Sequence, residues 1–173
     1  MSKLHFISPT VPQSAAVTVR LGTNAGQFAA VDEGKFVKLG AESQYNLCAA
    51  GDPIEGVIAA VETAKSGGHS IGSIFQGGRM RVLADGLQAT PGTGSIAIGD
   101  YVVCGSVTAL GTDLPSYPKV CKATQQPGAV PADLTAAGLQ ARNAIFAWRV
   151  VSLGPVGTGA VGTEIVVQRE NVR

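Results

Sequence analysis

The residues of this chain that come nearest to a nucleophile and its base are Ser70 and His69, which are adjacent in the sequence. A serine nucleophile needs a histidine base, an acid that orients the histidine, and donors that bind the developing oxyanion. The pair carries no specific signal for the acid or the donors, and the other histidine, His5, lies far away in the sequence. We therefore interpret the pair as chance neighbours in a turn, and we expect no catalytic residues and no enzyme activity.

Four carboxylates offer a second possibility, because general acid–base catalysis uses paired Asp or Glu side chains. Each of these residues stands beside Gly or Pro: Asp52, Glu55, Asp85 and Asp100. Carboxylates at such positions commonly brace turns by accepting backbone hydrogen bonds. The pattern therefore indicates structural carboxylates rather than an acid–base pair.

The cysteines and histidines do not have the spacing of a metal site. A structural zinc site gathers its ligands at short spacings. Cys48, Cys104 and Cys121 form no Cys-x-x-Cys pair, and the two histidines are far apart. We expect three free, buried thiols and no metal, although a disulfide between Cys104 and Cys121 stays open as an alternative.

Residues 157–162 read GTGAVG and fit the glycine pattern of dinucleotide-binding loops. That fingerprint requires a helix directly afterwards, whose N-terminus holds the pyrophosphate. A β-branched segment follows here instead. The pattern therefore predicts a glycine-rich hairpin loop and no cofactor.

The elements that must position these residues are set by turn signals, which recur about every ten residues between Gly51 and Val103. Short apolar segments lie between these Gly, Pro and Asp clusters, and this rhythm is typical of hairpins. We expect strands near residues 17–21, 27–31, 35–39, 45–49, 70–75, 79–84, 96–104, 144–153 and 164–168. The fold class predicted is all-β, a small barrel or β-tulip-like domain with at most one or two short helices.

Two segments are harder to assign. Asp52 and Pro53 could begin a helix, and the apolar residues from Ile54 to Val61 have helical spacing, but Gly56 would cost about 1 kcal/mol inside it. We predict a strand there. Residues 132–142 are the one acceptable helix candidate, within a loop-rich insertion expected over residues 105–143.

The first 20 residues are expected to form an extended arm ahead of a single β-domain at 21–173. Pro9 and Pro12 disfavour a central strand, and the apolar residues spread along the arm are Leu4, Phe6, Ile7 and Val11. An extended arm of this length reaches roughly 60 Å. It either packs on its own domain or lies across a neighbour, and we favour the neighbour.

Composition narrows the function classes. Charged residues make up 14% of the chain, against roughly 25% in a typical domain, which favours a surface partly covered by other protein. A soluble β-protein with an uncharged polar surface is the plainer alternative. The net charge of +1 and the lack of a basic run argue against nucleic-acid binding. No apolar run is long enough for a membrane helix, and the N-terminus lacks a secretory signal, so we expect a soluble product made in the cytoplasm.

Four stretches together resemble the head decoration, or cement, proteins of tailed phages. They are GDPIEGVIAAVE at 51–62, HSIGSIFQGGRMRV at 69–82, IAIGDYVV at 96–103, and the pair AWRVVSLG and TEIVVQ at 147–168. The resemblance implies a small β-barrel or β-tulip-like protein that forms homotrimers on the outside of an icosahedral capsid. Its partners would be its own copies and the major capsid protein, whose subunits it would bridge, and its place would be the virion capsid surface.

The mechanism expected is adhesion. The arm residues Leu4, Phe6, Ile7 and Val11 would lie along a capsid subunit, and three arms acting together can raise affinity by roughly 10²–10⁴. The alternative is another virion or tail β-module acting as a receptor- or glycan-binding domain. A small β-barrel enzyme is the least favoured interpretation.

Overall fold

The computed structural model describes residues 16–22, 27–40, 43–66, 69–106, 118–124 and 147–170, without the side chains of residues 63–66 and 69. The described chain is almost entirely β-structure, which confirms the predicted all-β class with a closed small barrel. The first five strands are β1 (Ala16–Leu21), β2 (Phe36–Leu39), β3 (Tyr45–Leu47), β4 (Gly56–Ser66) and β5 (His69–Phe75), with one 3-10 turn, η2 (Ala30–Asp32). The others are β6 (Arg79–Leu87), β7 (Thr90–Pro91), β8 (Val102–Cys104), β9 (Lys119–Lys122), β10 (Trp148–Ser152) and β11 (Glu164–Arg169).

Strands β1 to β5 close into a barrel in the order β1-β3-β2-β4-β5, and we call it barrel 1. The β1–β3 pair is parallel, and the other pairs are antiparallel. Alternate side chains point inward, as the period of two of a β-strand requires. The interior holds Leu21, Phe28, Val37, Ile58 and Ile74, all buried.

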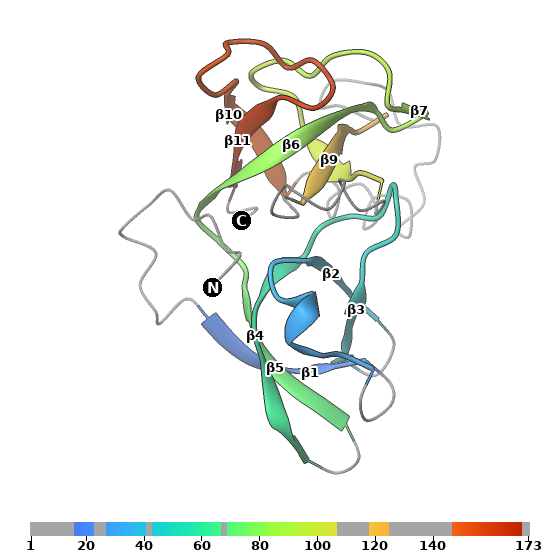
Figure 1. The fold of residues 1–173 in the computed structure, drawn as a ribbon, viewed down its shortest axis with the longest axis vertical. Coiled ribbons are helices and arrows are strands. Elements are labelled where there is room, and N and C mark those ends of the chain that lie inside the picture. Colours follow the sequence, from blue (N-terminus) through green and yellow to red (C-terminus); the bar gives the residue numbers. More distant parts are fainter. Residues whose placement is uncertain are drawn as a thin grey trace.

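The remaining strands form a second sheet in the order β10-β11-β6-β9-β8, with the short β7 beside β6. This sheet also curls until its ends meet, because Tyr101, just before β8, forms an antiparallel bridge with Arg149 in β10. We call this structure barrel 2. In Figure 1 the two barrels lie one above the other along the long axis of the molecule.

The two barrels have the same topology. In barrel 1 the first strand pairs in parallel with the third, and the ring continues through the second, fourth and fifth strands. In barrel 2, β6 pairs in parallel with β9, and the ring continues through β8, β10 and β11. Strands β6, β8, β9, β10 and β11 are therefore the equivalents of β1, β2, β3, β4 and β5.

The equivalence extends to single hydrogen bonds. In barrel 1 the amide of Gly34 donates to the carbonyl of Ile58 at 2.8 Å, and Ile58 donates to the residue after that glycine at 3.0 Å. In barrel 2, Gly99 donates to Val150, and Val150 donates to the residue after that glycine, both at 2.9 Å. Gly34 and Gly99 both have φ near +90° (86° and 94°), where a side chain would be strained.

A β-bulge also recurs at the same place. The β4–β5 register shifts between Ile58 and Ala60, and the β10–β11 register shifts between Val150 and Ser152. Because a bulge bends its strand and increases the local twist, a shared bulge gives both barrels the same curvature at this point. The described chain is therefore a tandem of two copies of one barrel.

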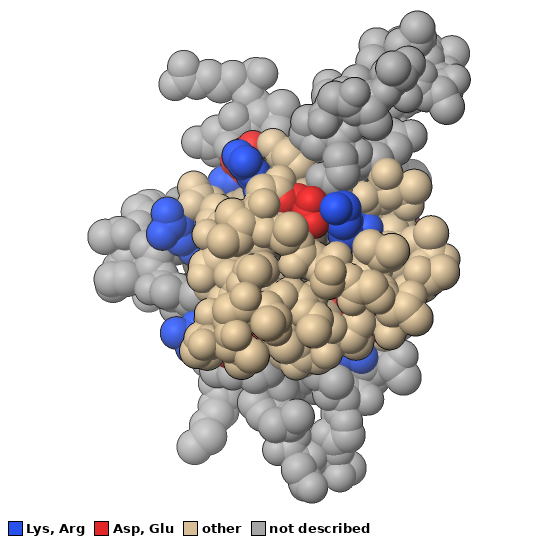
Figure 2. Space-filling view, turned by 90° about the horizontal axis from the view of Figure 1, so that it is seen from above, with Lys and Arg blue, Asp and Glu red and all other residues tan. Residues whose placement is uncertain are grey.

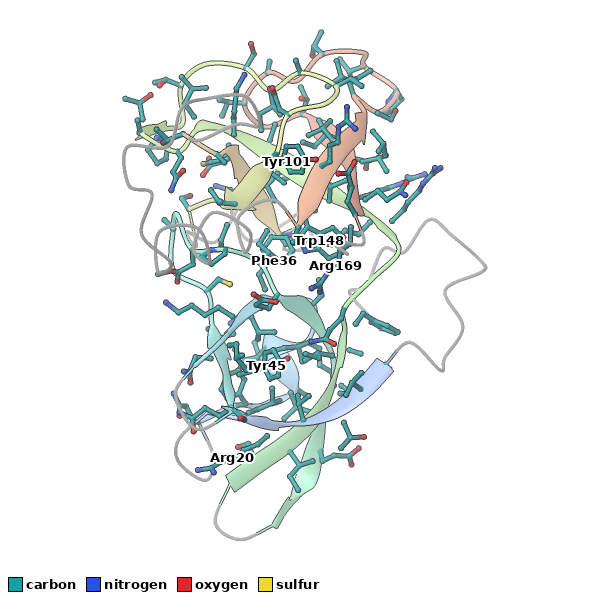
Figure 3. All side chains as sticks on the ribbon, turned by 180° about the vertical axis from the view of Figure 1, so that it is seen from behind. Arg20, Phe36, Tyr45, Tyr101, Trp148 and Arg169 are labelled. Atoms are coloured by element: carbon teal, nitrogen blue, oxygen red, sulfur yellow. The ribbon has the colours of Figure 1, made fainter. Side chains whose placement is uncertain are left out.

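The barrels meet where the open lower end of barrel 2 rests on the side of barrel 1. Phe36 and Val57 point out of barrel 1, because the next residues in the chain, Val37 and Ile58, point into its interior and side chains alternate along a strand. They pack in one buried cluster with Met80 and Trp148, and Figure 3 shows Trp148 close to Phe36 between the two barrels. That cluster continues into the interior of barrel 2, where its members include Val82, Ala84, Val102, Val120, Val150, Ile165 and Val167.

Polar contacts fix the same junction. The indole Nε1 of Trp148 donates to the carbonyl of Ile54 at 3.1 Å. The guanidinium of Arg169 donates to the carbonyl of Glu55 and lies 3.6 Å from its carboxylate. The backbone of Cys104 bonds the loop before β4, through Gly51 and Asp52, at 2.8 and 3.0 Å.

Several expected elements differ in detail. The strand expected at 27–31 is wrong, because Phe28 turns into barrel 1 and Ala30–Asp32 form the 3-10 turn. Strand β9 lies inside the insertion expected at 105–143, and residues 16–20 of the expected arm belong to barrel 1. Of residues 96–104 only Val102–Cys104 form a strand, after a turn at Gly99. The helix expected at 132–142 lies outside the described residues.

Candidate protein-interaction surface

The structure places Ser70 and the backbone of His69 in strand β5. His69 pairs through its backbone with Ser66 at the end of the β4–β5 hairpin, and Ser70 is buried. Among the described residues, His, Cys, Asp and Glu form no group that could hold a metal ion. No helix in the described part of the chain is long and apolar enough to cross a membrane.

Three aspartates hold turns of one kind. The carboxylates of Asp32, Asp52 and Asp100 each accept the amide of the alanine three residues earlier, at 2.9, 2.6 and 2.8 Å. Each also has a lysine partner, at 2.6, 2.7 and 3.0 Å: Lys35, Lys38 and Lys122. The structural role predicted for Asp52 and Asp100 is confirmed.

Asp85 and Cys121 form a buried contact in barrel 2. One carboxylate oxygen of Asp85 accepts the amide of Ser106 at 2.6 Å, and the thiol of Cys121 lies 3.8 Å from the same oxygen. Burial, followed by the negative charge of Asp85, raises the pKa of Cys121 to about 12. This thiol therefore stays protonated at neutral pH and is a poor nucleophile.

All three cysteines are free and buried, as predicted, and the alternative disulfide between Cys104 and Cys121 is absent. Cys48 and Cys104 come from different barrels and meet at the junction. A hydrogen bond with Cys104, followed by burial, raises the pKa of Cys48. These thiols pack as small apolar side chains rather than as reactive groups.

The described surface has one extensive region without charge, at the end of barrel 2 farthest from barrel 1. It is formed by residues 86–99 and 153–163, which we call the cap loops. Neither range contains Asp, Glu, Lys, Arg or His. Figure 2, which looks down on this end, shows a broad uncharged area with few charged side chains in view.

The two cap loops are joined to each other by backbone contacts. Ser95 forms an antiparallel bridge with Ala160, and the amide of Ile96 donates to the carbonyl of Gly159 at 2.9 Å. A Cβ atom on Gly159 would lie only 1.7 Å from the oxygen of Ile96, so the loops approach this closely because the residue is glycine. Thr163 adds bonds from its hydroxyl to two carbonyls of its own loop, at 2.7 and 2.9 Å.

Large apolar side chains stand out from these loops. Ile98 and Val156 are each 64% exposed, and Val161 is 40% exposed. Ile96, two residues before Ile98, instead fills the interior of barrel 2. The cap loops thus anchor themselves with one buried side chain and present others to the outside.

This surface suits contact with another macromolecule rather than catalysis. The centres of protein interfaces are depleted of charge, and they exclude water from apolar groups. Reasoning from the sequence identified the cap glycines only as turn formers and missed the surface. The absence of charge over residues 86–99 was the signal that could have found it.

The arm residues predicted to contact a partner, Leu4, Phe6, Ile7 and Val11, lie outside the described residues. Comparison of the chain with known protein families, with curated proteins and with solved structures finds no match. The fold and the cap loops are therefore the features of this chain that bear on its function.

Proposed function

We propose that this chain is a structural virion protein that binds the outside of an icosahedral capsid and stabilises it by bridging major capsid subunits. The observation that carries the proposal is the uncharged, hydrogen-bonded surface of the cap loops. The resemblance of the strand and turn pattern to phage decoration proteins supplies the kind of partner. In this role the protein acts by adhesion and performs no chemistry.

Binding through the cap would draw on apolar burial. Each exposed aliphatic side chain, such as Ile98 or Val156, contributes about 1.5–3 kcal/mol when it passes from water into a packed interface. Association also costs about 4–15 kcal/mol in lost translational and rotational freedom. One cap is therefore a weak adhesive, and a homotrimer that presents three caps to one lattice overcomes this cost through multivalency.

The arm ahead of β1 would add a second contact. Strand β1 begins at Ala16, so the apolar residues Leu4 to Val11 precede barrel 1 in the sequence, and in this proposal they would contact a neighbouring subunit. An extended segment of this kind can add a strand to an exposed sheet edge, where main-chain hydrogen bonds provide affinity. In this proposal the arm extends to a neighbouring subunit, and the cap loops form the main contact area.

The test is decoration of empty shells assembled from the major capsid protein of the same genome. The purified chain should sediment with these shells and raise the temperature at which they come apart. Deletion of residues 2–12 should leave a folded oligomer that decorates poorly. If the deleted protein reaches full occupancy, the arm has no part in binding. If the full chain binds glycans but not shells, the receptor-binding alternative replaces the proposal.

A further inference from the structure

Equivalent connections in the two barrels differ in charge. Residues 85–99 of barrel 2 correspond to residues 22–34 of barrel 1, since Ala84 is equivalent to Leu21 and Gly99 to Gly34. Likewise the β10–β11 connection corresponds to the β4–β5 hairpin. The barrel 2 versions contain one charged residue, Asp85, which is buried, whereas the barrel 1 versions contain Asp32, Glu33, Glu62 and Lys65.

These two regions also point in opposite directions. The β4–β5 hairpin lies at the lower end of Figure 1, and the cap loops lie at the upper end. Glu62 in the hairpin and Lys35 near the 3-10 turn are exposed. The two ends of the molecule's long axis therefore differ: the barrel 1 end carries exposed charged side chains, and the cap loops at the other end carry none.

We infer that the chain stands on an uncharged patch of a capsid protein surface, with the cap loops against that patch and barrel 1 pointing into solvent. This inference rests on the proposed function and adds to it the orientation of the chain and the chemistry of the partner's patch. The partner's patch must lack charge because the cap offers no counter-ion. A charge buried against it would lose its hydration with no compensating pair, which is strongly unfavourable.

A neutral contact of this kind has a recognisable dependence on salt. Salt screens attraction between exposed charges, with a Debye length of about 10 Å at 0.1 M. Binding between two uncharged patches has no such attraction to lose. We therefore expect the affinity for shells to change less than about twofold between 50 and 500 mM NaCl.

Two matched aspartate substitutions test the orientation. Ile98 in the cap and Val31 in barrel 1 lie in Ala-x-x-Asp turns of the same kind and are 64% and 63% exposed. Ile98→Asp should weaken shell binding about tenfold or more, since it buries an unpaired charge, whereas Val31→Asp should bind like the unsubstituted chain. Thermal unfolding of both variants checks that each remains folded.

A second pair of variants carries the same short epitope peptide in equivalent hairpins. One variant has it between residues 67 and 68, in the β4–β5 connection, and the other has it between residues 157 and 158, in the cap. On decorated shells an antibody should reach the first epitope, and the second variant should fail to bind.

The outcomes separate the inference from the proposed function. If the unsubstituted chain does not bind shells, the proposed function fails, and this inference fails with it. If the chain binds shells but Val31→Asp is impaired as much as Ile98→Asp, only the orientation is overturned. A loss of affinity of tenfold or more between 50 and 500 mM NaCl would show that the contacted patch is charged.

Discussion

At the positions where barrel 1 carries Phe36 and Val57, barrel 2 carries Tyr101 and Arg149. Both pairs are adjacent across the same two strands and point out of their barrels. The first pair is buried at the junction, whereas Tyr101 and Arg149 lie at the surface and both bond Glu170. The two barrels share one backbone fold, and they differ in the side chains that point outward. These outward side chains determine which face is buried in an interface and which face stays exposed to solvent.

The ends of the two barrels also differ in which side chains are buried. Barrel 2 ends in Met80 and Trp148, which are buried against barrel 1. The equivalent residues of barrel 1 are Val17 and Gly56, and Val17 is 46% exposed. Near this end, barrel 1 has instead a hydrogen bond of 2.7 Å from the Gln76 amide to the Tyr45 hydroxyl.

The largest effect is expected from removing the indole that joins the barrels. Trp148→Ala deletes the side chain that fills the end of barrel 2 and donates to Ile54, so the free energy of unfolding should fall by about 3–5 kcal/mol. Urea unfolding followed by circular dichroism measures it. Trp148→Phe retains much of the packing and should lose less. A loss below about 1 kcal/mol for the alanine variant would mean that the junction contributes little to stability.

The next effect concerns the cap, which has no uncharged counterpart in barrel 1. Gly159→Ala places a Cβ atom against the oxygen of Ile96 and should cost about 1–3 kcal/mol, because the loops must separate. Thermal unfolding is the measurement. Gly77→Ala is the control, since a Cβ atom there meets nothing within 4 Å and the residue has no positive φ. Equal stability of the two variants would contradict the close approach.

A smaller effect tests whether two turns of the same kind, one in each barrel, contribute equally to the free energy of unfolding. Asp32→Ala and Asp100→Ala each remove the acceptor for an alanine amide and the partner of a lysine, so each should cost about 1 kcal/mol. Chemical denaturation of both variants gives the two values. Asparagine at either position keeps an acceptor oxygen and should recover most of the loss. A loss confined to one variant would show that the same hydrogen bonds contribute differently in the two barrels.

The smallest effect is expected from Tyr101→Phe, which gives barrel 2 the residue that barrel 1 has at the equivalent position, Phe36. The hydroxyl of Tyr101 donates to Glu170, and this bond is the main reason that the pKa of Glu170 lies below its usual value. Tyr101→Phe should therefore raise the pKa of Glu170, which an NMR titration of its carboxyl carbon measures.

The dependence on pH has a definite sign. A carboxyl with a lowered pKa in the folded state stabilises the fold at neutral pH, and this contribution is lost as the pH falls through the folded pKa. The small stability difference between the unsubstituted chain and Tyr101→Phe should thus disappear in acid. A difference that stays constant down to pH 2 would assign the effect to packing instead.

Much of the local structure could be predicted because turns are specified by single residues. Asp52 and Asp100 beside glycines mark the turns before β4 and β8, and both turns are present. The strand predicted over residues 54–61 is confirmed from Gly56 onward. The helix that Asp52 could have begun does not form, because its carboxylate accepts the amide of Ala49 behind it instead.

The arrangement of the strands could not be predicted in the same way. Equivalent interior residues are alike, as in Ile58 and Val150, but equivalent outward residues can differ as much as Val57 and Arg149 do, so no repeat stands out in the sequence. Strand β9 was missed because Pro118 directly precedes its four residues. The uncharged surface emerges only when residues 86–99 and 153–163 come together in space.

The end-to-side contact between the barrels has a consequence for assembly. An interface that joins two different faces of a repeated unit can add further units without limit and build a filament. Here barrel 2 has Arg149 on its side where barrel 1 has Val57, and barrel 1 has Gly56 where barrel 2 has Trp148. The side of barrel 2 lacks the apolar residue, and barrel 1 lacks the indole, so the same contact cannot repeat from barrel to barrel along a filament.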